Sequence, residues 1–295
     1  MPHHHCAADQ SSDVRHPLDP LTIQEVDRAR AILRDHQDIG AAPRFPFVEL
    51  REPPKAEIDA YVEGSDFSRV AIIVTIDIAT GRAGEALVDL RAGKLLSWKQ
   101  LQVDHEHGHP PIIVDDFFRA AAIVKADPQW RAAMARRGLS AKEIDLIQVD
   151  PISPGFFEFE PYKGRRILRA VSYYREYERD NAYAHPIEGI VAIVDLIANE
   201  IIALHDDGRL VPIPRQKYNY DSESLAPARS DLKALEIVQP DGPSFTVDGW
   251  RVTWQDWEFR IGFTPREGLV LHQLGFRDNG RLRPVVYRAS ITEMA

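Results

Sequence analysis

The sequence has one cysteine, no apolar run of membrane-spanning length and no basic run. The single thiol, Cys6, excludes an internal disulfide, and a reducing cytoplasm is the expected location. A membrane helix needs about 18 uninterrupted apolar residues, so no membrane partner is expected. The net charge of −9 argues against a nucleic-acid partner, because such a partner requires a basic surface. The start, MPHHHCAADQSSDVR, lacks the apolar centre of a signal peptide.

The length and composition are those of a globular chain with several domains. The chain has 295 residues, of which 44% are hydrophobic and 27% charged, and this is enough for two or three domains. Turn-forming and polar stretches divide it. We predict a disordered start over 1–15, a first small α/β domain over 16–110, a second over 111–214, a linker over 215–230, and a β segment over 231–295.

The first domain combines one helix with a meander of strands. Thr22 and Glu25 have the spacing of a capping box, and apolar residues at helical spacing follow as far as Leu33. A strand is predicted over Phe45–Leu50, ended by two prolines. Three further strands are predicted at 70–78, 84–90 and 95–103, with hairpin-like connectors between them.

The second domain repeats this plan with more helix. A helix over Asp115–Lys125 is expected to bury its apolar residues Phe117, Phe118, Ala121 and Val124. Asp127-Pro128 is typical of an N-cap followed by the first helical residue, and Ser140 with Glu143 forms a second capping box. The predicted strands are Ile144–Val149, Gly155–Glu160, Arg166–Arg175, Gly189–Ile197 and Glu200–His205.

The last stretch indicates four β runs, Phe245–Val247, Arg251–Phe263, Leu269–Phe276 and Arg283–Ile291. Alternation of Trp257, Phe259, Ile261 and Phe263 with polar residues or glycine predicts a strand with one buried face. The run Leu269–Phe276 is apolar on both faces and expects cover on both. A handful of such strands cannot close a sandwich. The predicted fold class is therefore α+β, with two small helix-plus-antiparallel-sheet domains followed by the first strands of a large β-sandwich whose remainder is absent.

Four strings carry a resemblance to a known family: RRILRAVSYYRE, NAYAHPIEGIVAIVDL, QPDGPSFTVDG and TPREGLVLHQLGFRDNGRLRPVVYRASITEM. In order and spacing they resemble the copper amine oxidases, over nearly all of 16–294. The resemblance implies two small α/β domains and a dimerising β-sandwich catalytic domain. It also implies copper, topaquinone and oxidation of a small primary amine to aldehyde, ammonia and hydrogen peroxide.

The resemblance also implies what these 295 residues do not contain. The family's quinone-forming tyrosine, its aspartate base and its three copper-binding histidines fall beyond Ala295. No catalytic or metal-binding residue is therefore expected here, and neither cofactor is expected to bind this chain alone. The alternative is a non-catalytic dimerisation or interaction module derived from the family.

The family's amine channel supplies the candidate site residues. By the resemblance, the channel-gating aromatic that precedes His-Pro in NAYAHP is Tyr183, where some members carry tryptophan. Pro111 and Ile112 match the other edge of the channel. Channel walls are mainly apolar with few polar groups, and these three residues fit that description.

Two features could be taken for a catalytic or metal site. Asn219-Tyr220-Asp221 matches the core of the family's quinone-precursor motif, but it lies in a polar linker, so we expect Tyr220 to be an ordinary linker tyrosine. His105, His107 and His109 alternate, and in an extended segment their imidazoles would project to one side. Three such ligands could hold copper or zinc and support an unrelated activity, although a mobile loop makes a poor metal site. The run His3–His5 is at best a weak chelator.

The remaining polar candidates have structural explanations. His185 and His272 are expected to be hydrogen-bonded structural residues. Asp115 and Asp116 at a helix start suit the helix macrodipole. Lys163, Arg165 and Arg166 could bind an anion, but a solvated hairpin end is the preferred interpretation.

Overall fold

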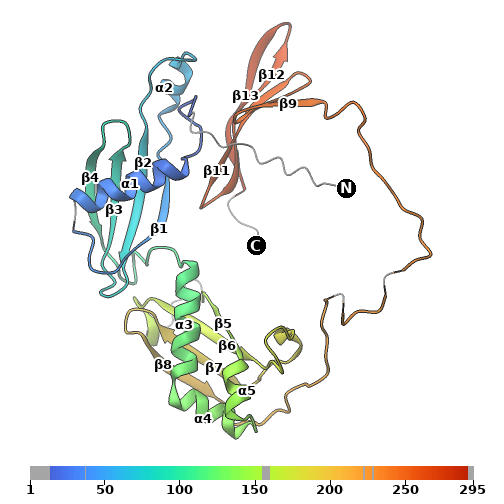
Figure 1. The fold of residues 1–295 in the computed structure, drawn as a ribbon. Helices are drawn as coiled ribbons and strands as arrows, with labels where there is room; N and C mark the ends of the chain where they lie inside the picture. The colour runs from blue at the N-terminus through green and yellow to red at the C-terminus, as the bar shows by residue number, and fades with distance from the viewer. Residues whose placement is uncertain (1–13, 37, 155–159, 222, 228, 292–295) are drawn as a thin grey trace. The chain divides into compact units, whose positions relative to one another are not determined.

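The computed structural model describes residues 14–36, 38–154, 160–221, 223–227 and 229–291 (Figure 1). The chain divides into two compact units. The first contains residues 1–76, 84–101 and 236–295, and the second contains residues 77–83 and 102–235. Among the described residues, no helix is both long and apolar enough to cross a membrane.

The first unit begins with helix α1 (Ile23–His36), which starts at the predicted capping box. The Glu25 N–H donates to Thr22 Oγ1 at 3.1 Å, and the Thr22 N–H donates to the Glu25 carboxylate at 2.9 Å. Helix α1 lies across one face of a four-stranded sheet (Figure 1). The strands, in spatial order, are β1 (Pro43–Leu50), β2 (Val70–Asp77), β3 (Ala83–Asp89) and β4 (Lys94–Leu101).

The core of this domain lies between helix and sheet. Ala29 and Leu33 of α1 are fully buried together with Ile73 of β2 and Val88 of β3. A short helix that the sequence did not predict, α2 (Lys55–Ala60), follows Pro54. No side chain caps the start of α2, so the usual sequence signal for a helix start is missing. The two prolines before it indicated only the end of the preceding strand.

The rest of the first unit is a five-stranded antiparallel sheet. Its strands are β9 (Phe245–Asp248), β10 (Arg251–Trp254), β11 (Trp257–Thr264), β12 (Gly268–Asp278) and β13 (Arg281–Ser290), in the order β13-β12-β11-β10-β9. The single strand predicted over Arg251–Phe263 is wrong. A tight turn at Gln255, with φ of 54°, splits it into a hairpin. The turn contains no glycine or proline, so the sequence did not mark it.

The five-stranded sheet has one polar and one apolar face. Arg260 pairs with Arg251 and His272, and His272 pairs with Arg288. Residues directly opposite each other share a face, so these four define the polar face. The apolar face carries Phe245, Val247, Trp254, Trp257, Phe259, Ile261, Phe263, Leu269 and Leu271.

The predicted alternation is correct, and the apolar face, which the sequence expects further strands to cover, is exposed among the described residues. Phe263 is 65% exposed and Leu269 is 57% exposed on the apolar face, whereas His272 on the polar face is buried. The polar face is the buried one because Arg260 and Arg288 form ion pairs with Asp19 and Glu52, which belong to the domain that contains α1 and β1–β4. Strand periodicity cannot reveal such contacts.

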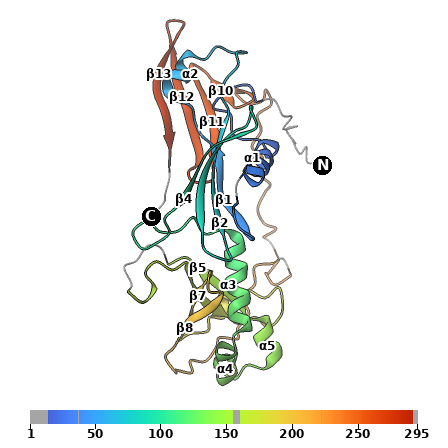
Figure 2. The ribbon, with the colours of Figure 1, turned by 90° about the vertical axis from the view of Figure 1, so that its left-hand side faces the viewer.

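The second unit packs three helices on one face of a four-stranded antiparallel sheet (Figures 1 and 2). The helices are α3 (Val114–Ala126), α4 (Pro128–Arg136) and α5 (Ala141–Leu146). The strands, in spatial order, are β5 (Gln148–Ile152), β6 (Ile167–Tyr173), β7 (Ile190–Asp195) and β8 (Glu200–Asp206). Two short 3-10 turns, η1 (Glu160–Tyr162) and η2 (Ala182–Ala184), lie in the connections.

The predicted caps of this unit are confirmed. The Asp127 carboxylate accepts from the Trp130 N–H at 2.7 Å, and Ser140 exchanges hydrogen bonds with Glu143. The core gathers Trp130, Met134, Leu168 and other apolar residues that face the helices.

Three expectations about this unit are not met. Phe118 is 71% exposed, because it lies on the side of α3 that faces away from the core, unlike its neighbour Phe117. The strand expected from Ile144 begins only at Gln148, because the helix that starts at the Ser140 cap continues to Leu146. Of the strand expected over Gly155–Glu160, residues 155–159 lie outside the described residues, and Glu160 begins η1.

The described residues between 207 and 244 contain no helix or strand. Their apolar side chains are largely solvent-exposed, with Leu235 at 88% and Ile237 at 91%. The predicted linker falls within this stretch. The domain boundaries 1–15, 16–110, 111–214, 215–230 and 231–295 stay predictions.

Candidate functional site

A cavity of about 890 Å³ lies in the second unit. Its floor is the sheet face opposite the helices, because Arg169 pairs with Ile193 and Val191 pairs with His205 across this face. Their neighbours along each strand, such as Leu168, point instead into the helical core. The segment 104–112 and the residues 162–167 form the other walls.

The cavity brings together two of the three predicted channel residues. Pro111 and Ile112 both line it. Tyr183 does not, because it lies on η2, where its side chain is 65% exposed and its ring meets Tyr173 edge-on at 5.2 Å. A hydrogen bond to Asp150 raises the pKa of the Tyr183 phenol.

The three alternating histidines do not share one side of an extended segment. Asp104 and Gly108 form a bridge that closes a turn, and His107 Nδ1 lies 2.8 Å from the Asp104 carboxylate. The hydrogen bond from His107 holds the pKa of Asp104 well below its usual range. His109 instead places Nε2 3.0 Å from the Gly164 carbonyl, and burial lowers the pKa of its imidazole.

Arg166 is a buried structural residue, which corrects its interpretation as part of a solvated hairpin end. Its side chain is 1% exposed and forms an ion pair at 2.7 Å with Asp116, which is equally buried. Arg166 also donates to the carbonyls of Pro110 and Pro111. The Asp116 carboxylate accepts in addition from the Ile113 N–H at the start of α3. This pair fixes the cavity wall to the helix.

The Asn-Tyr-Asp motif lies in the strandless stretch, as the sequence predicted. Asn219 is its anchor, since its side chain accepts from the Asn181 N–H at 2.8 Å and donates to the Tyr177 hydroxyl. Tyr220 itself is 80% exposed. Asp221 accepts from the Ser224 N–H and hydroxyl. The motif therefore works here as a turn.

His185 is a hydrogen-bonded structural residue, as predicted. It is buried, and Nδ1 donates to the Pro214 carbonyl at 2.9 Å. Nε2 lies 3.4 Å from the buried Asp180 carboxylate. The Tyr174 ring packs edge-on against it.

His272 is also buried, at the centre of an ionic cluster of the first unit. Its Nε2 lies 3.8 Å from Glu52, and burial lowers the pKa of the ring. The Arg288 guanidinium donates to the carboxylate of Glu52 at 3.0 Å and to that of Glu267, which lies in the turn just before β12. Gly262, opposite Val270, leaves the space that the His272 ring occupies, since a Cβ there would meet Nε2 at 2.8 Å.

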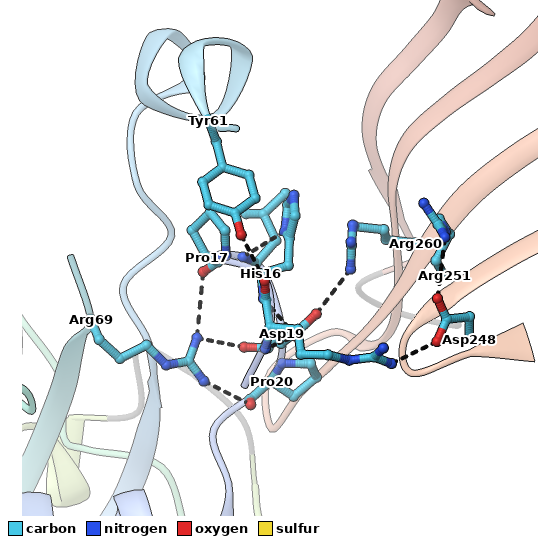
Figure 3. A network of polar contacts seen from close by, with 11 residues as sticks. His16, Pro17, Asp19, Pro20, Tyr61, Arg69, Asp248, Arg251 and Arg260 are labelled. Atoms are coloured by element: carbon cyan, nitrogen blue, oxygen red, sulfur yellow. Dashed lines mark hydrogen bonds and ion pairs between the residues drawn. The ribbon is translucent and has the colours of Figure 1, made fainter. Parts of the chain in front are cut away.

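A second polar network in the first unit was not predicted from the sequence (Figure 3). The Asp19 carboxylate accepts from the N–H groups of Arg15 and His16 and from Arg260 of β11 at 3.0 Å. Arg69, 2% exposed, donates to the carbonyls of Pro17, Asp19 and Pro20. Burial and the nearby Arg260 lower the pKa of His16 to about 3. The network ties the start of the domain to the sheet.

The fold and the family models define the class of this protein. Residues 22–97 match the AGAO-like N2 domain, residues 115–224 the copper amine oxidase N3 domain, and residues 246–295 the copper amine oxidase enzyme domain. The chain belongs to the copper amine oxidase family and covers the N-terminal part of its members. The resemblance and the α+β fold class are thereby confirmed.

Individual relatives agree with this assignment. The chain is 46% identical over 281 residues to a primary amine oxidase of Arthrobacter sp. strain P1. The match covers 95% of this chain and 42% of the relative. It is 38% identical over 281 residues to a histamine oxidase of Arthrobacter globiformis, and this match covers 95% of this chain and 40% of the relative. The chain thus spans less than half the length of these relatives.

A solved structure supports the fold alone. A copper-containing benzylamine oxidase from Hansenula polymorpha superposes with a TM-score of 0.75 at 22% identity, over 93% of this chain and 44% of that one.

The described residues do not fit the two cofactors of the family. Histidine ligation of copper requires imidazoles that converge, and the described residues contain no group of three or more His, Cys, Asp or Glu side chains placed to hold a metal. Tyr220 lacks the surrounding strands that would position a quinone. The run His3–His5 lies outside the described residues. We derive no catalytic step through copper or quinone from these residues.

Proposed function

We propose that this chain is the N-terminal portion of a copper- and topaquinone-dependent enzyme that oxidises small primary amines to aldehyde, ammonia and hydrogen peroxide. The observation that carries this proposal is the 46% identity to a primary amine oxidase over 95% of the chain. Two further relatives are named for histamine and for diamines, so the proposal extends to the substrate class. As in the family, the partner would be a second copy.

Within that enzyme, Pro111, Ile112 and Tyr183 are proposed to border the amine channel. Pro111 and Ile112 support this role as apolar wall residues of the cavity. Tyr183 supports it as an exposed aromatic that rests on Tyr173. A cytoplasmic location is proposed from the single cysteine.

The test is a chimera. Residues 16–295 replace the matching part of a copper methylamine oxidase of Arthrobacter sp. strain P1, to which the chain is also 46% identical. The chimera is then loaded with copper in air. The chimera is expected to develop a phenylhydrazine-reactive chromophore and to release peroxide from methylamine, whereas the 295-residue chain alone is expected to do neither. A folded chimera without either signal, beside an active unaltered parent enzyme, would overturn the proposal.

The second candidate is a non-catalytic dimerisation or interaction module. It is favoured by one observation, the exposed apolar face of the five-stranded sheet, on which Phe263 and Leu269 are more than half exposed. Chromophore formation in the chimera would decide for the enzyme, since a module diverged from catalysis has no reason to retain that capacity.

A further inference from the structure

The cavity of the second unit has a charge that its proposed place beside an amine channel does not explain. Its lining contains the cations Lys163, Arg165, Arg166 and Arg169 but a single carboxylate, Asp104. This excess of positive charge stands in a chain whose net charge is −9. A concave, low-dielectric wall concentrates such a potential and attracts anions.

Two of these four cations already have anionic partners. Arg165 forms an ion pair at 2.8 Å with Asp195, and Arg166 is bound to Asp116. Arg169 differs from them. It lies in the middle of β6, directly opposite Ile152 on one side and Ile193 on the other, and within the part of the chain that the structure describes its guanidinium makes no hydrogen bond or ion pair.

The Arg169 side chain is exposed to solvent, and its protein neighbours on the cavity floor are apolar. Ile167 on the same strand and Val191 and Ile193 on β7 line the cavity floor, and Ile112 lines its wall. A cavity of about 890 Å³ is in the usual range for small-molecule sites. A guanidinium presents a planar fork of donors that matches a carboxylate. A guanidinium that has no partner among the described residues and lies over an apolar floor is complementary to a ligand with an apolar chain and one carboxylate.

We propose that this cavity binds an amphipathic carboxylate, with the carboxylate on the Arg169 guanidinium and the apolar chain over Ile167, Val191 and Ile193. The site is independent of the proposed oxidase chemistry, whose substrates are cationic amines.

The experiment is isothermal titration of the 295-residue chain with decanoate, below its micellar concentration. Decanoate is expected to bind with one site per chain. Arg169→Gln is expected to weaken binding about tenfold to a hundredfold, the range for a charge-assisted hydrogen bond, and Arg169→Lys to recover part of it. Arg179→Gln makes the same chemical change at an exposed loop residue of the unit outside the cavity lining and is expected to bind like wild type.

Other ligands test each half of the site. Acetate lacks the chain, decanol lacks the charge and decylamine reverses it, so all three are expected to bind more weakly than decanoate. Equal or tighter binding of decylamine would overturn the proposal, as would equal affinity of Arg169→Gln and Arg179→Gln for decanoate. If Arg169→Gln proves misfolded by circular dichroism, Arg169→Lys and the ligand series decide. Because no amine oxidation is measured, this result stands apart from that of the chimera.

Discussion

At the residue scale, buried charges with several partners determine how the first unit is held together. Asp19 accepts two backbone N–H groups and the Arg260 guanidinium while its side chain is 5% exposed. Removing one partner of such a pair leaves the other charge buried without compensation, which costs far more than the pair itself contributes. Exposed ion pairs contribute little, because water already solvates both partners.

We therefore expect Asp19→Ala to destabilise the first unit by about 3 kcal/mol. Arg260 and the N–H groups of Arg15 and His16 would lose their acceptor. The measurement is urea unfolding followed by tryptophan fluorescence. The control is Asp27→Ala, which breaks an exposed pair with Arg30 and should cost at most about 0.5 kcal/mol. Equal losses in the two variants would contradict the network's role.

Glu49 gives the first unit a pH dependence. Burial, together with the nearby Glu267 and Glu52, raises the pKa of Glu49 from 4.5 to about 7. A group with a raised folded-state pKa binds its proton more tightly in the folded state. The contribution of Glu49 to the free energy of unfolding is therefore complete below pH 4.5 and is lost as the pH rises through 7.

Glu49→Gln mimics the protonated carboxyl at every pH. The melting temperature of wild type is therefore expected to fall relative to this variant between pH 5 and pH 8. Glu57→Gln, an exposed change on α2, serves as the control and should track wild type throughout. A constant difference between wild type and Glu49→Gln across this range would show that Glu49 titrates normally.

At the element scale, one buried ion pair joins a helix to a strand. Arg166, just before β6, reaches the Asp116 carboxylate in the first turn of α3 and the carbonyls of Pro110 and Pro111. The helix start, the preceding segment and the sheet are thereby fixed together. The capping boxes of α1 and α5 are local by contrast, since each closes within four residues.

Arg166→Met is expected to destabilise the second unit by about 3–5 kcal/mol. Combining it with Asp116→Leu should cost less, because the double variant leaves no buried carboxylate unpaired. Amide hydrogen exchange of α3 and β6 reports the loss. Arg169→Met is the matched control three residues further along the chain. Its side chain has no partner among the described residues, so the substitution should change the free energy measured by exchange by no more than about 0.5 kcal/mol. A double variant as unstable as Arg166→Met would argue against the pair.

At the scale of the whole molecule, the five-stranded sheet has an apolar face that the described residues leave exposed. Phe245, Val247, Trp254, Phe263 and Leu269 are each between 46% and 65% exposed. Exposed apolar faces of this kind drive association with other chains.

The 295-residue chain is therefore expected to dimerise or aggregate through this face. Phe263→Glu combined with Leu269→Glu should shift light scattering toward the monomer and reduce binding of a hydrophobic dye. Gln239→Glu with Thr246→Glu adds the same charge at exposed positions off the apolar face and should change neither. Deleting residues 231–295 should also shift light scattering toward the monomer, as expected for Phe263→Glu combined with Leu269→Glu. A monomeric wild-type chain with low dye binding would contradict this expectation.

The sequence by itself determined the local structure and the family. Capping boxes at Thr22 and Ser140, the Asp127-Pro128 helix start and the hairpin turns act within a few residues, so the chain displays them directly. The strings around His185 and His272 identified the copper amine oxidases. The prediction of a hydrogen-bonded structural residue is confirmed for His185, whose imidazole binds the Pro214 carbonyl. His272 is buried but makes no hydrogen bond among the described residues, and its Nε2 lies 3.8 Å from Glu52.

Only the tertiary structure decided which side of each element is buried and which charges meet. Alternation in β11 distinguished its apolar face from its polar face. It did not show that the polar face packs within this chain, because Arg260 binds Asp19, which lies 241 residues away in the sequence. Arg166 resembled a surface residue until folding placed Asp116 beside it. The cavity around Arg169 depends on strand register and on the path of 104–112. Periodicity and spacing report only near neighbours along the chain, whereas burial and ion pairing depend on contacts between distant segments.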